Sequence, residues 1–461
     1  KNRNSMKVEE IDQRKIKLIK SGRNFLGILN DIKRRPEDAA NELKISLEKI
    51  NSILSGDSEL TDDIVNIAVK IWPVNRRDFY IMEDDCPEGI KIMTASESEK
   101  SSRIMNRAGK PYYEYRDTAM SKIGPFRPEW IEEICHVKDN DPENDNVQWN
   151  NGHFMHQFTY FIGRVNFYYK DENGIKQTAV MNSGDSMYIT PFVPHTFATG
   201  DGAKENGLIL ALTYGGKLTG DPQHELSALS GLGSEFALDF SSKEKTYSSL
   251  LKFHRENANL SLNEISKRTG ISKDELGKFE NGTKNPTIEE LKKIAESQTI
   301  NIRDLLPNDK IEKKVIVKHH EECKSWFFPE DSKCYKMYEL VTSTTLPFSK
   351  SFEIEILDEN SPKLDLRSGT HQYAYNIGKV PVTFNWKLGK NVYKKEFHPG
   401  DSLYIKPFIS HNFRGNGKII VLRIGGKTSG DAQRELSIVG KDNAERAISE
   451  TTQWFDPQGK N

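Results

Sequence analysis

The feature that most constrains the fold is an internal duplication. Residues 184–197 read GDSMYITPFVPHTF, and residues 400–413 read GDSLYIKPFISHNF. Farther along, GGKLTGD at 215–221 has a twin, GGKTSGD, at 425–431. Both pairs are separated by roughly two hundred residues, a period that indicates a repeated structural unit. The chain is therefore expected to fold as two copies of one architecture.

Each copy has a β part that follows a helical part. In the β part, short segments rich in β-branched and aromatic residues alternate with Gly, Asp and Pro turns. In the first copy these segments are 158–169, 177–182, 186–190 and 208–214. Many short strands separated by such turns are typical of a jelly roll of the cupin kind.

The helical part has the outline of a helix-turn-helix. Residues 260–282 carry apolar side chains at helical spacing, and Gly270 interrupts them where the turn is expected. Residues 24–71 show the same outline with a blurred pattern. The predicted fold class is α+β, a tandem repeat of an all-α, helix-turn-helix-like part followed by a cupin (jelly-roll) β-barrel. The predicted domains are 1–94 (N-terminal degenerate helix-turn-helix), 95–240 (candidate catalytic cupin barrel), 241–310 (helix-turn-helix-like), 311–440 (second, degenerate cupin barrel) and 441–461 (C-terminal tail).

Composition excludes several classes of protein. Lys+Arg 66 against Asp+Glu 67 gives a net charge of -1, so no overall field attracts nucleic acid or an anionic membrane. No apolar run approaches the roughly 18 residues of a membrane span, and no signal peptide opens the sequence. The four cysteines are widely scattered, which favours a reducing cytoplasm over a disulfide scaffold. We therefore expect a cytoplasmic protein with no membrane partner.

The first β part contains a candidate metal site. His153 and Gln157 are four residues apart, so on a strand they would point to the same face. His195 follows a second strand and a proline turn, where such barrels supply another ligand. Two imidazoles and one side-chain oxygen resemble the facial site of non-haem iron(II) oxygenases, which leaves positions open for substrate and O₂. A carboxylate is usual there, and this chain offers a neutral amide.

Only one of the two copies keeps this set. His371 and Gln372 align with His156 and Gln157, and His411 aligns with His195. The position of His153 falls on Ser368, so one imidazole is missing. We therefore predict that the second β part is a structural copy without metal.

A transcriptional regulator is the main alternative, because a helix-turn-helix joined to a cupin is a familiar layout of such proteins. Between Lys252 and Leu306 there are 10 Lys+Arg and 9 Asp+Glu, whereas phosphate contacts require a basic face. The candidate recognition helix, 272–281, also carries Asp274, Glu275 and Glu280. These charges favour a scaffold or subunit-contact role, with no nucleic-acid partner.

Nearly the whole chain resembles the hydroxyethylphosphonate dioxygenase and methylphosphonate synthase family. The motifs that carry the resemblance are NNGH at 150–153, the segment 184–195, and Arg107-x-Gly109-x-x-Tyr112-Tyr113-x-Tyr115. In the dioxygenase branch a glutamate ligand lies six residues before the second histidine, where this chain has Ile189. Gln157 matches the glutamine ligand of the synthase branch. The resemblance therefore implies the synthase branch.

The resemblance also implies the chemistry and the residues that perform it. It implies Fe(II)- and O₂-dependent cleavage of the C–C bond of 2-hydroxyethylphosphonate, giving methylphosphonate and CO₂. The implied metal ligands are His153, Gln157 and His195. The implied substrate contacts are Lys33, Arg107, Tyr115, Asn150 and His195, with Lys33 and Tyr115 also catalytic.

Three other outcomes stay open. The sister activity would give hydroxymethylphosphonate and formate from the same substrate. A regulator, or a cupin that only binds an anionic metabolite, would give no product. We expect a homo-oligomer, because the helical parts and Lys33 are suited to contacts between subunits.

Overall fold

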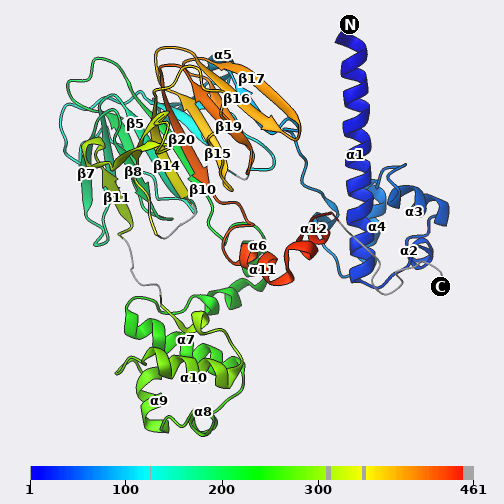
Figure 1. The fold of residues 1–461 in the computed structure, drawn as a ribbon. Helices are drawn as coiled ribbons and strands as arrows, with labels where there is room; N and C mark the ends of the chain where they lie inside the picture. Colours follow the sequence, from blue (N-terminus) through cyan, green and yellow to red (C-terminus); the bar gives the residue numbers. More distant parts are fainter. Residues whose placement is uncertain (1, 125, 308–312, 345–348, 450–461) are drawn as a thin grey trace.

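A computed structural model describes residues 2–124, 126–307, 313–344 and 349–449, with side chains described within residues 13–448. Two β units form the main body, and two helical bundles lie outside it (Figure 1). The order along the chain is helical, β, helical, β, as the duplication predicted.

The first helical bundle packs around a small apolar core. Its helices are α1 (Asn2–Asp31), α2 (Pro36–Leu43), α3 (Leu47–Leu54) and α4 (Asp62–Ile71), followed by the 3-10 turn η1 (Arg76–Phe79). Phe25, Leu29 and Ile50 are fully buried in this core. Each such side chain stabilises the bundle by roughly 1.5–3 kcal/mol. Apolar contacts thus hold a bundle whose sequence pattern is blurred.

The second helical bundle follows the predicted helix-turn-helix closely. Its helices are α7 (Lys243–Asn257), α8 (Leu262–Thr269), α9 (Lys273–Glu280) and α10 (Ile288–Gln298), followed by η3 (Ile302–Leu305). The Thr287 hydroxyl accepts from the Glu290 backbone N–H at 3.2 Å, which caps α10. Gly270 ends α8 with φ 74°, a conformation that costs a glycine little.

Each β unit contains two facing sheets. The first unit has β2 (Arg103–Arg107), β3 (Lys110–Asp117), β4 (Glu129–Glu133), β5 (His156–Ile162), β6 (Val165–Lys170), β7 (Lys176–Met181), β8 (Ser186–Ile189), β9 (His195–Thr199) and β10 (Gly207–Tyr214). The larger sheet runs β8-β5-β10-β4-β3-β2, and the smaller runs β7-β6-β9. Apolar side chains such as Ile131, Phe161 and Phe197 fill the space between them.

The second unit repeats this plan. It has β12 (Ser325–Phe328), β13 (Tyr335–Glu339), β14 (Ser349–Ile356), β15 (His371–Asn376), β16 (Val382–Leu388), β17 (Asn391–Phe397), β18 (Ser402–Ile405), β19 (Ser410–Arg414) and β20 (Lys418–Ile424). Its sheets run β18-β15-β20-β14-β13-β12 and β17-β16-β19. Strand pairing among the described residues closes neither unit, so the mixed α+β fold is confirmed but a closed barrel is not.

The two units exchange strands at their edges. β1 (Ile90–Met93) precedes the first unit but pairs antiparallel with β18 of the second. β11 (Val315–Lys318) precedes the second unit but pairs antiparallel with β8 of the first. The predicted boundary after residue 94 therefore assigns β1 to a helical domain, although β1 extends a sheet. The predicted boundary at 310/311 and most of the predicted tail lie outside the described residues.

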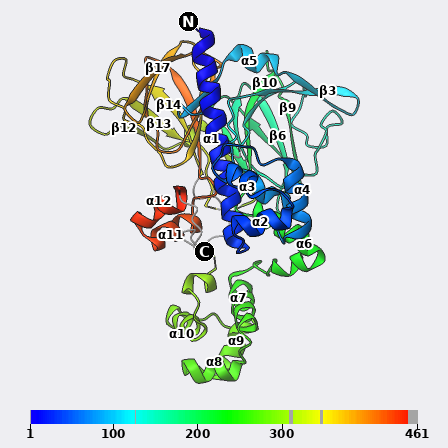
Figure 2. The same ribbon diagram turned by 90° about the vertical axis from the view of Figure 1, so that its right-hand side faces the viewer.

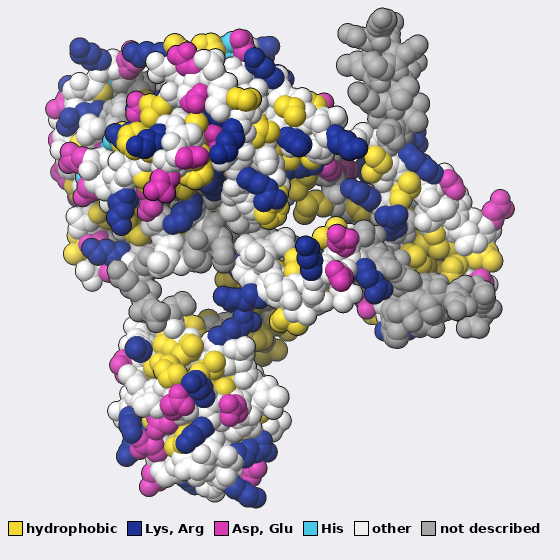
Figure 3. Space-filling view, viewed as in Figure 1, with side chains coloured by type: hydrophobic (Ala, Val, Ile, Leu, Met, Phe, Trp, Pro, Cys, Tyr) yellow, Lys and Arg dark blue, Asp and Glu magenta, His cyan; other side chains and the backbone are white. Residues whose placement is uncertain are grey.

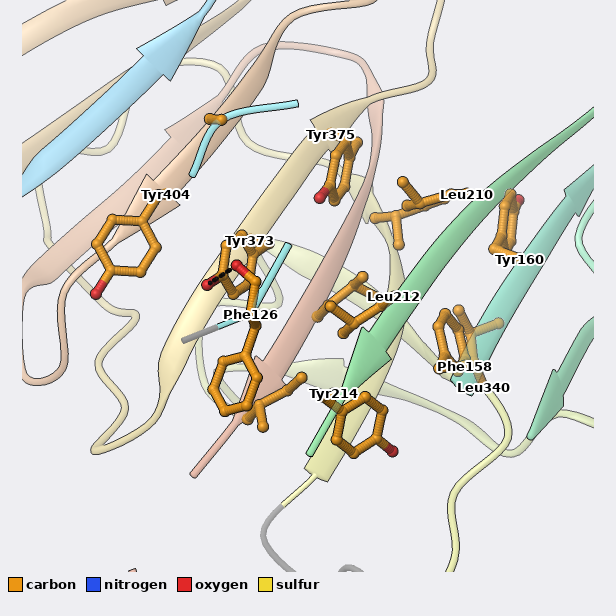
Figure 4. Packing of buried hydrophobic residues seen from close by; sticks show 14 of the residues in the cluster. Phe126, Phe158, Tyr160, Leu210, Leu212, Tyr214, Leu340, Tyr373, Tyr375 and Tyr404 are labelled. Carbon is orange, nitrogen blue, oxygen red and sulfur yellow. Dashed lines mark hydrogen bonds between the residues drawn. The ribbon is translucent and has the colours of Figure 1, made fainter. Parts of the chain in front are cut away.

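A shared core joins the two units. Leu210 and Leu212 of β10 face Tyr373 and Tyr375 of β15 across this core, and all four are buried (Figure 4). The Tyr373 hydroxyl donates to the carbonyl of Phe126 at 3.1 Å, so its polar atom is satisfied inside the core. The larger sheets thus pack back to back, and their opposite faces remain available to form the interior of each unit.

Four short helices of the described chain lie outside the two bundles, and one of them, α6, precedes the second bundle in the chain. They are α5 (Ala95–Lys100), α6 (Asp221–Leu229), α11 (Asp431–Val439) and α12 (Lys441–Ser449). Figures 1 and 2 show α6 and α11 between the β body and the α7–α10 bundle. No residue of α6 or α11 is buried within the chain. Among the described residues, no helix is long and apolar enough to cross a membrane.

The strand exchange brings a histidine against a buried carboxylate. His319, just after β11, donates from Nδ1 to Asp185 Oδ2 at 3.0 Å, and this bond raises the pKa of His319. A raised pKa stabilises the fold fully below the ordinary value of 6.5, and the contribution is lost as pH rises through the raised value. We expect His319→Gln to lower Tm more at about pH 6 than at about pH 9, measured by thermal unfolding. Equal losses at both values would contradict this, and His398→Gln, at an exposed pair with Glu396, is the control.

Candidate metal centre

The three predicted ligands converge on the inner face of the first β unit. Gln157 is on β5, and His195 begins β9. His153 lies in the turn before β5 and not on a strand, so strand alternation is not what aligns it with Gln157. The turn depends on Gly152, which has φ 78° and lies where a Cβ would meet the backbone of Phe192 at 2.5 Å. The Phe192 N–H then donates to the carbonyl of His153 at 2.8 Å and fixes the loop.

The backbone sets which nitrogen of each histidine carries the proton. His153 Nδ1 is 3.0 Å from the carbonyl of Met155, and His195 Nδ1 is 2.8 Å from the carbonyl of Val193. A carbonyl only accepts, so Nδ1 is the protonated nitrogen and Nε2 of each neutral ring has a lone pair. Burial lowers the pKa of His195 to about 4, which keeps that ring neutral. Neutral imidazoles with free Nε2 atoms are the form that binds metals.

The Gln157 side chain presents an oxygen to these nitrogens. Gln157 Nε2 donates to Thr159 Oγ1 at 2.9 Å, which turns Oε1 toward His153 Nε2 at 3.0 Å. The Gln157 oxygen and His153 Nε2 therefore lie side by side, and both atoms can bind a cation. The His153 and His195 rings lie 5.0 Å apart at 86°. One amide oxygen and two imidazoles fit a divalent iron ion in both donor type and number.

Asn150 is held with its amide nitrogen toward the same point. Its Oδ1 accepts from the backbone N–H of His195 at 3.0 Å and from that of Gly152 at 2.9 Å. Nδ2 therefore points inward, 3.3 Å from His195 Nε2. A neutral donor at this position is suited to an anionic ligand.

A cavity of about 190 Å³ adjoins the three ligands. Its lining residues are Arg107, Tyr113, Tyr115, Glu129, Ile131, Asn150, His153, Gln157, His195, Phe197, Ala211 and Thr213. Arg107 donates from Nη1 to the carbonyl of Gln148 at 2.6 Å, and its guanidinium lies 4.7 Å from the Tyr113 ring centre. These contacts fix the guanidinium and leave Nη2 and Nε as donors to a ligand. Burial raises the pKa of Tyr115 to about 12, so its hydroxyl stays a neutral donor.

Lys33 is the predicted site residue that the cavity of its own chain does not contain. It follows α1 with φ 56°, and its Nζ donates to the carbonyl of Asp31 at 2.7 Å. Figure 1 shows the α1–α4 bundle on the opposite side of the molecule from β5 and β8. The structure therefore brings together His153, Gln157, His195, Arg107, Tyr115 and Asn150, and it leaves Lys33 apart from them.

Two neighbours of Gln157 lie as the sequence indicated. His156 points to the opposite face, where its Nδ1 is 2.6 Å from the Tyr188 hydroxyl in the core between the units. Ile189 pairs with Gln157 in the β5–β8 register and is fully buried, so no carboxylate stands at that position.

Sequence reasoning missed Glu129 and Thr213. Glu129 faces the cavity from β4, and burial raises its pKa. Thr213 lies directly beside Gln157 in the β5–β10 register. The β4–β10 register places Glu129 at the cavity and the β5–β10 register places Thr213 there, and no local motif indicates either residue.

Three comparisons with known proteins agree with this architecture. A helix-turn-helix family model matches residues 251–297. A curated methylphosphonate synthase of Nitrosopumilus maritimus (strain SCM1) is 62% identical over 445 residues, which cover 96% of this chain and 97% of that protein. A solved structure of Streptomyces albus HEPD, with 2-hydroxyethylphosphonate and Fe(II) bound, is 32% identical with a TM-score of 0.87, covering 95% of this chain and 99% of that one. A variant of 2-hydroxyethylphosphonate dioxygenase shares the fold at 17% identity and TM-score 0.72, covering 92% and 99% of the two chains.

Proposed function

This chain belongs to the methylphosphonate synthase family, and from that premise we propose that it cleaves 2-hydroxyethylphosphonate with Fe(II) and O₂ to methylphosphonate and CO₂. The observation that carries the proposal is the Gln157 oxygen, which faces Nε2 of His153 beside a cavity with a fixed guanidinium. This arrangement supplies a metal position and an anion position next to each other.

The residues divide the work by their chemistry. His153, Gln157 and His195 hold the iron, which when bound supplies O₂ activation and a positive position for substrate oxygens. Arg107 binds phosphonate oxygens with its fork of N–H groups, oriented by Gln148 and Tyr113. Asn150 Nδ2 and the Tyr115 hydroxyl donate to the same oxygens. Because Tyr115 and Asn150 are neutral, they orient the anion without adding charge.

The neutral amide has an electrostatic consequence. Two imidazoles and an amide leave the full charge of the iron uncompensated, whereas a carboxylate would cancel part of it. We expect Gln157→Glu to raise the metal affinity of the substrate-free protein by about tenfold or more, which corresponds to about 1.4 kcal/mol. Competition with a chelator under anaerobic conditions measures it.

The matched control is Gln372→Glu, at the equivalent position of the second β unit. Gln372 Oε1 accepts from Arg423 Nε at 2.9 Å, so a glutamate there would pair with the guanidinium. Metal affinity should not change. An unchanged affinity in Gln157→Glu itself would contradict the proposed ligand role of Gln157.

One assay tests the reaction and separates it from its alternatives. The purified protein is loaded anaerobically with Fe(II) and 2-hydroxyethylphosphonate, O₂ is admitted, and products are followed by phosphorus NMR. A methylphosphonate signal supports the proposal. Hydroxymethylphosphonate would assign the sister dioxygenase activity, and substrate binding without product would assign a binding protein.

A transcriptional regulator is the second candidate, because the helix-turn-helix match covers α8 and α9. The charges oppose it. Arg255 pairs with Glu280 at 2.6 Å, which uses a basic group inside the bundle. On the face seen in Figure 3, the bundle mixes basic and acidic side chains and has no continuous basic stripe. At physiological salt we expect no specific DNA binding in a fluorescence anisotropy assay.

We propose that Lys33 completes the site of another subunit in a homo-oligomer. Two observations support this: Lys33 does not line the cavity of its own chain, and α6 and α11 bury nothing within the chain. Most of the stability of a protein helix comes from packing of one face, so exposed helices of this kind are suited to packing on a partner. The ammonium group would then add a positive charge to the phosphonate end of the partner's cavity.

The finer description of the fold is also our proposal. We describe each β unit as an open jelly roll of the cupin kind, and keep the predicted domain boundaries with β1 and β11 as exchanged edge strands.

The four cysteines are free, which suits a reducing cytoplasm.

A further inference from the structure

The second β unit contains a counterpart of the metal centre, position by position. Gln157 pairs with Thr213 in the β5–β10 register, and Gln372 pairs with Arg423 in the β15–β20 register. The carbonyl of His153 accepts from the backbone N–H of Phe192, and that of Ser368 accepts from Phe408 at 2.7 Å. His411 Nδ1 is 2.8 Å from the carbonyl of Ile409, as His195 Nδ1 is from Val193.

The guanidinium of Arg423 contacts the amide oxygen of Gln372 in this counterpart. Arg423 Nε donates to Gln372 Oε1 at 2.9 Å, which is the oxygen that corresponds to the metal-facing oxygen of Gln157. Gln372 is fully buried, and its Nε2 has no partner among the described residues. The side chain is therefore turned to present its oxygen to Arg423, although this leaves its own N–H groups unmet. Because the donor is charged, this hydrogen bond is stronger than one from a neutral N–H group would be.

In the second β unit, larger side chains occupy positions that correspond to the cavity of the first unit. Ala211 pairs with Glu129 in the first unit, and Val421 pairs with Phe352 in the second. Three cavity positions thus change from Glu129, Ala211 and Thr213 to Phe352, Val421 and Arg423. The Arg423 guanidinium lies 5.3 Å from the Phe352 ring centre, a distance that favours a cation–π contact.

We propose that the Arg423 guanidinium takes the place of the metal cation in the second β unit, and that residues 368 and 423 together restrict the chain to one iron. The inference rests on the iron site proposed for the first unit. Burial lowers the pKa of Arg423 to about 10, which still leaves it charged at neutral pH. Gln372 Oε1 then has a positive partner, and burial together with the charge of Arg423 lowers the pKa of His411 to about 4. The amide oxygen of Gln372 therefore has a cationic partner without any metal.

Restoring the two residues should create a second metal site. We compare Ser368→His, Arg423→Thr and the double variant, loaded anaerobically with Fe(II), and measure metal per chain by elemental analysis. We expect about one iron per chain in each single variant and about two in the double variant. In the second β unit, only the double variant has two imidazoles, an amide oxygen and no competing cation. Loading with Fe(II) should raise Tm of the double variant through its second ion. Ser368→His binds no second ion, so its Tm should show no such increase.

Adding His195→Asn separates this inference from the proposed function. In that background the first site is removed, so metal bound by the restored chain reports the second unit alone, and about one ion is expected. A folded double variant that stays at one metal, or no metal in the His195→Asn background, would overturn the inference. If the double variant does not fold, Ser368→His decides: one metal supports the block by Arg423, and two metals overturn it. A wild-type chain without metal would instead count against the proposed function.

Discussion

Replacing His195 with asparagine is expected to empty the first metal centre and lower turnover by more than about a hundredfold. Changes to residues that only orient metal ligands already cost about 10–100-fold, and His195 supplies one of three ligands directly. Asparagine is shorter but retains an N–H group toward the carbonyl of Val193, which limits the structural damage. Iron content by elemental analysis and methylphosphonate formation by phosphorus NMR measure the two effects.

The duplication supplies a matched control in the same molecule. Like His195, His411 is buried, lies on the equivalent strand, β19, and makes a 2.8 Å contact through Nδ1 to a backbone carbonyl. His411→Asn should lower Tm about as much as His195→Asn, because both remove a buried ring. It should leave iron content and turnover unchanged. Comparable loss of iron in both variants would show that folding, and not ligation, explains the first result.

Much of the fold could be predicted because the duplication and the helix signals are local. The helix-turn-helix was predictable from the helical spacing of its apolar residues and from Gly270, which ends α8 as expected. The exchange of β1 and β11 could not be predicted, since each short apolar segment fits either unit by pattern alone. Which edge it joins depends on how the two units pack through their shared core. That packing is a long-range property, absent from any single window of the sequence.

The site shows the same division between local and long-range information. The types and spacing of His153, Gln157 and His195 predicted a convergence that the structure reproduces, but strand alternation was the wrong reason for His153. The turn at Gly152 aligns it instead. The pairing of β4 with β10 brings Glu129 to the cavity, and the pairing of β20 with β15 brings Arg423 to Gln372. The sequence thus shows the residue types of a motif, whereas the residues that surround the motif can be identified only from the pairing of the strands.

Mixing two inactive variants is expected to restore activity if Lys33 acts on a partner subunit. Lys33→Asn removes the ammonium at a backbone conformation that asparagine tolerates, with φ 56°, and His195→Asn removes the iron. In an equimolar co-expressed oligomer, about one site in four combines an intact metal centre with an intact lysine, because each comes independently from one of two chains. Turnover should therefore rise from near zero to about a quarter of the wild-type rate.

The control pairs two defects that lie in the same metal centre. Gln157→Ala mixed with His195→Asn should stay inactive, since both ligands come from one chain and no exchange of subunits rebuilds the set. Recovery in that mixture would mean that the β units themselves exchange strands between chains. If the turnover of the Lys33→Asn and His195→Asn mixture only equals the sum of the two variants measured separately, Lys33 acts within its own chain. It would then have to reach the cavity by a movement of the α1–α4 bundle, because in the present arrangement that bundle lies across the molecule from β5.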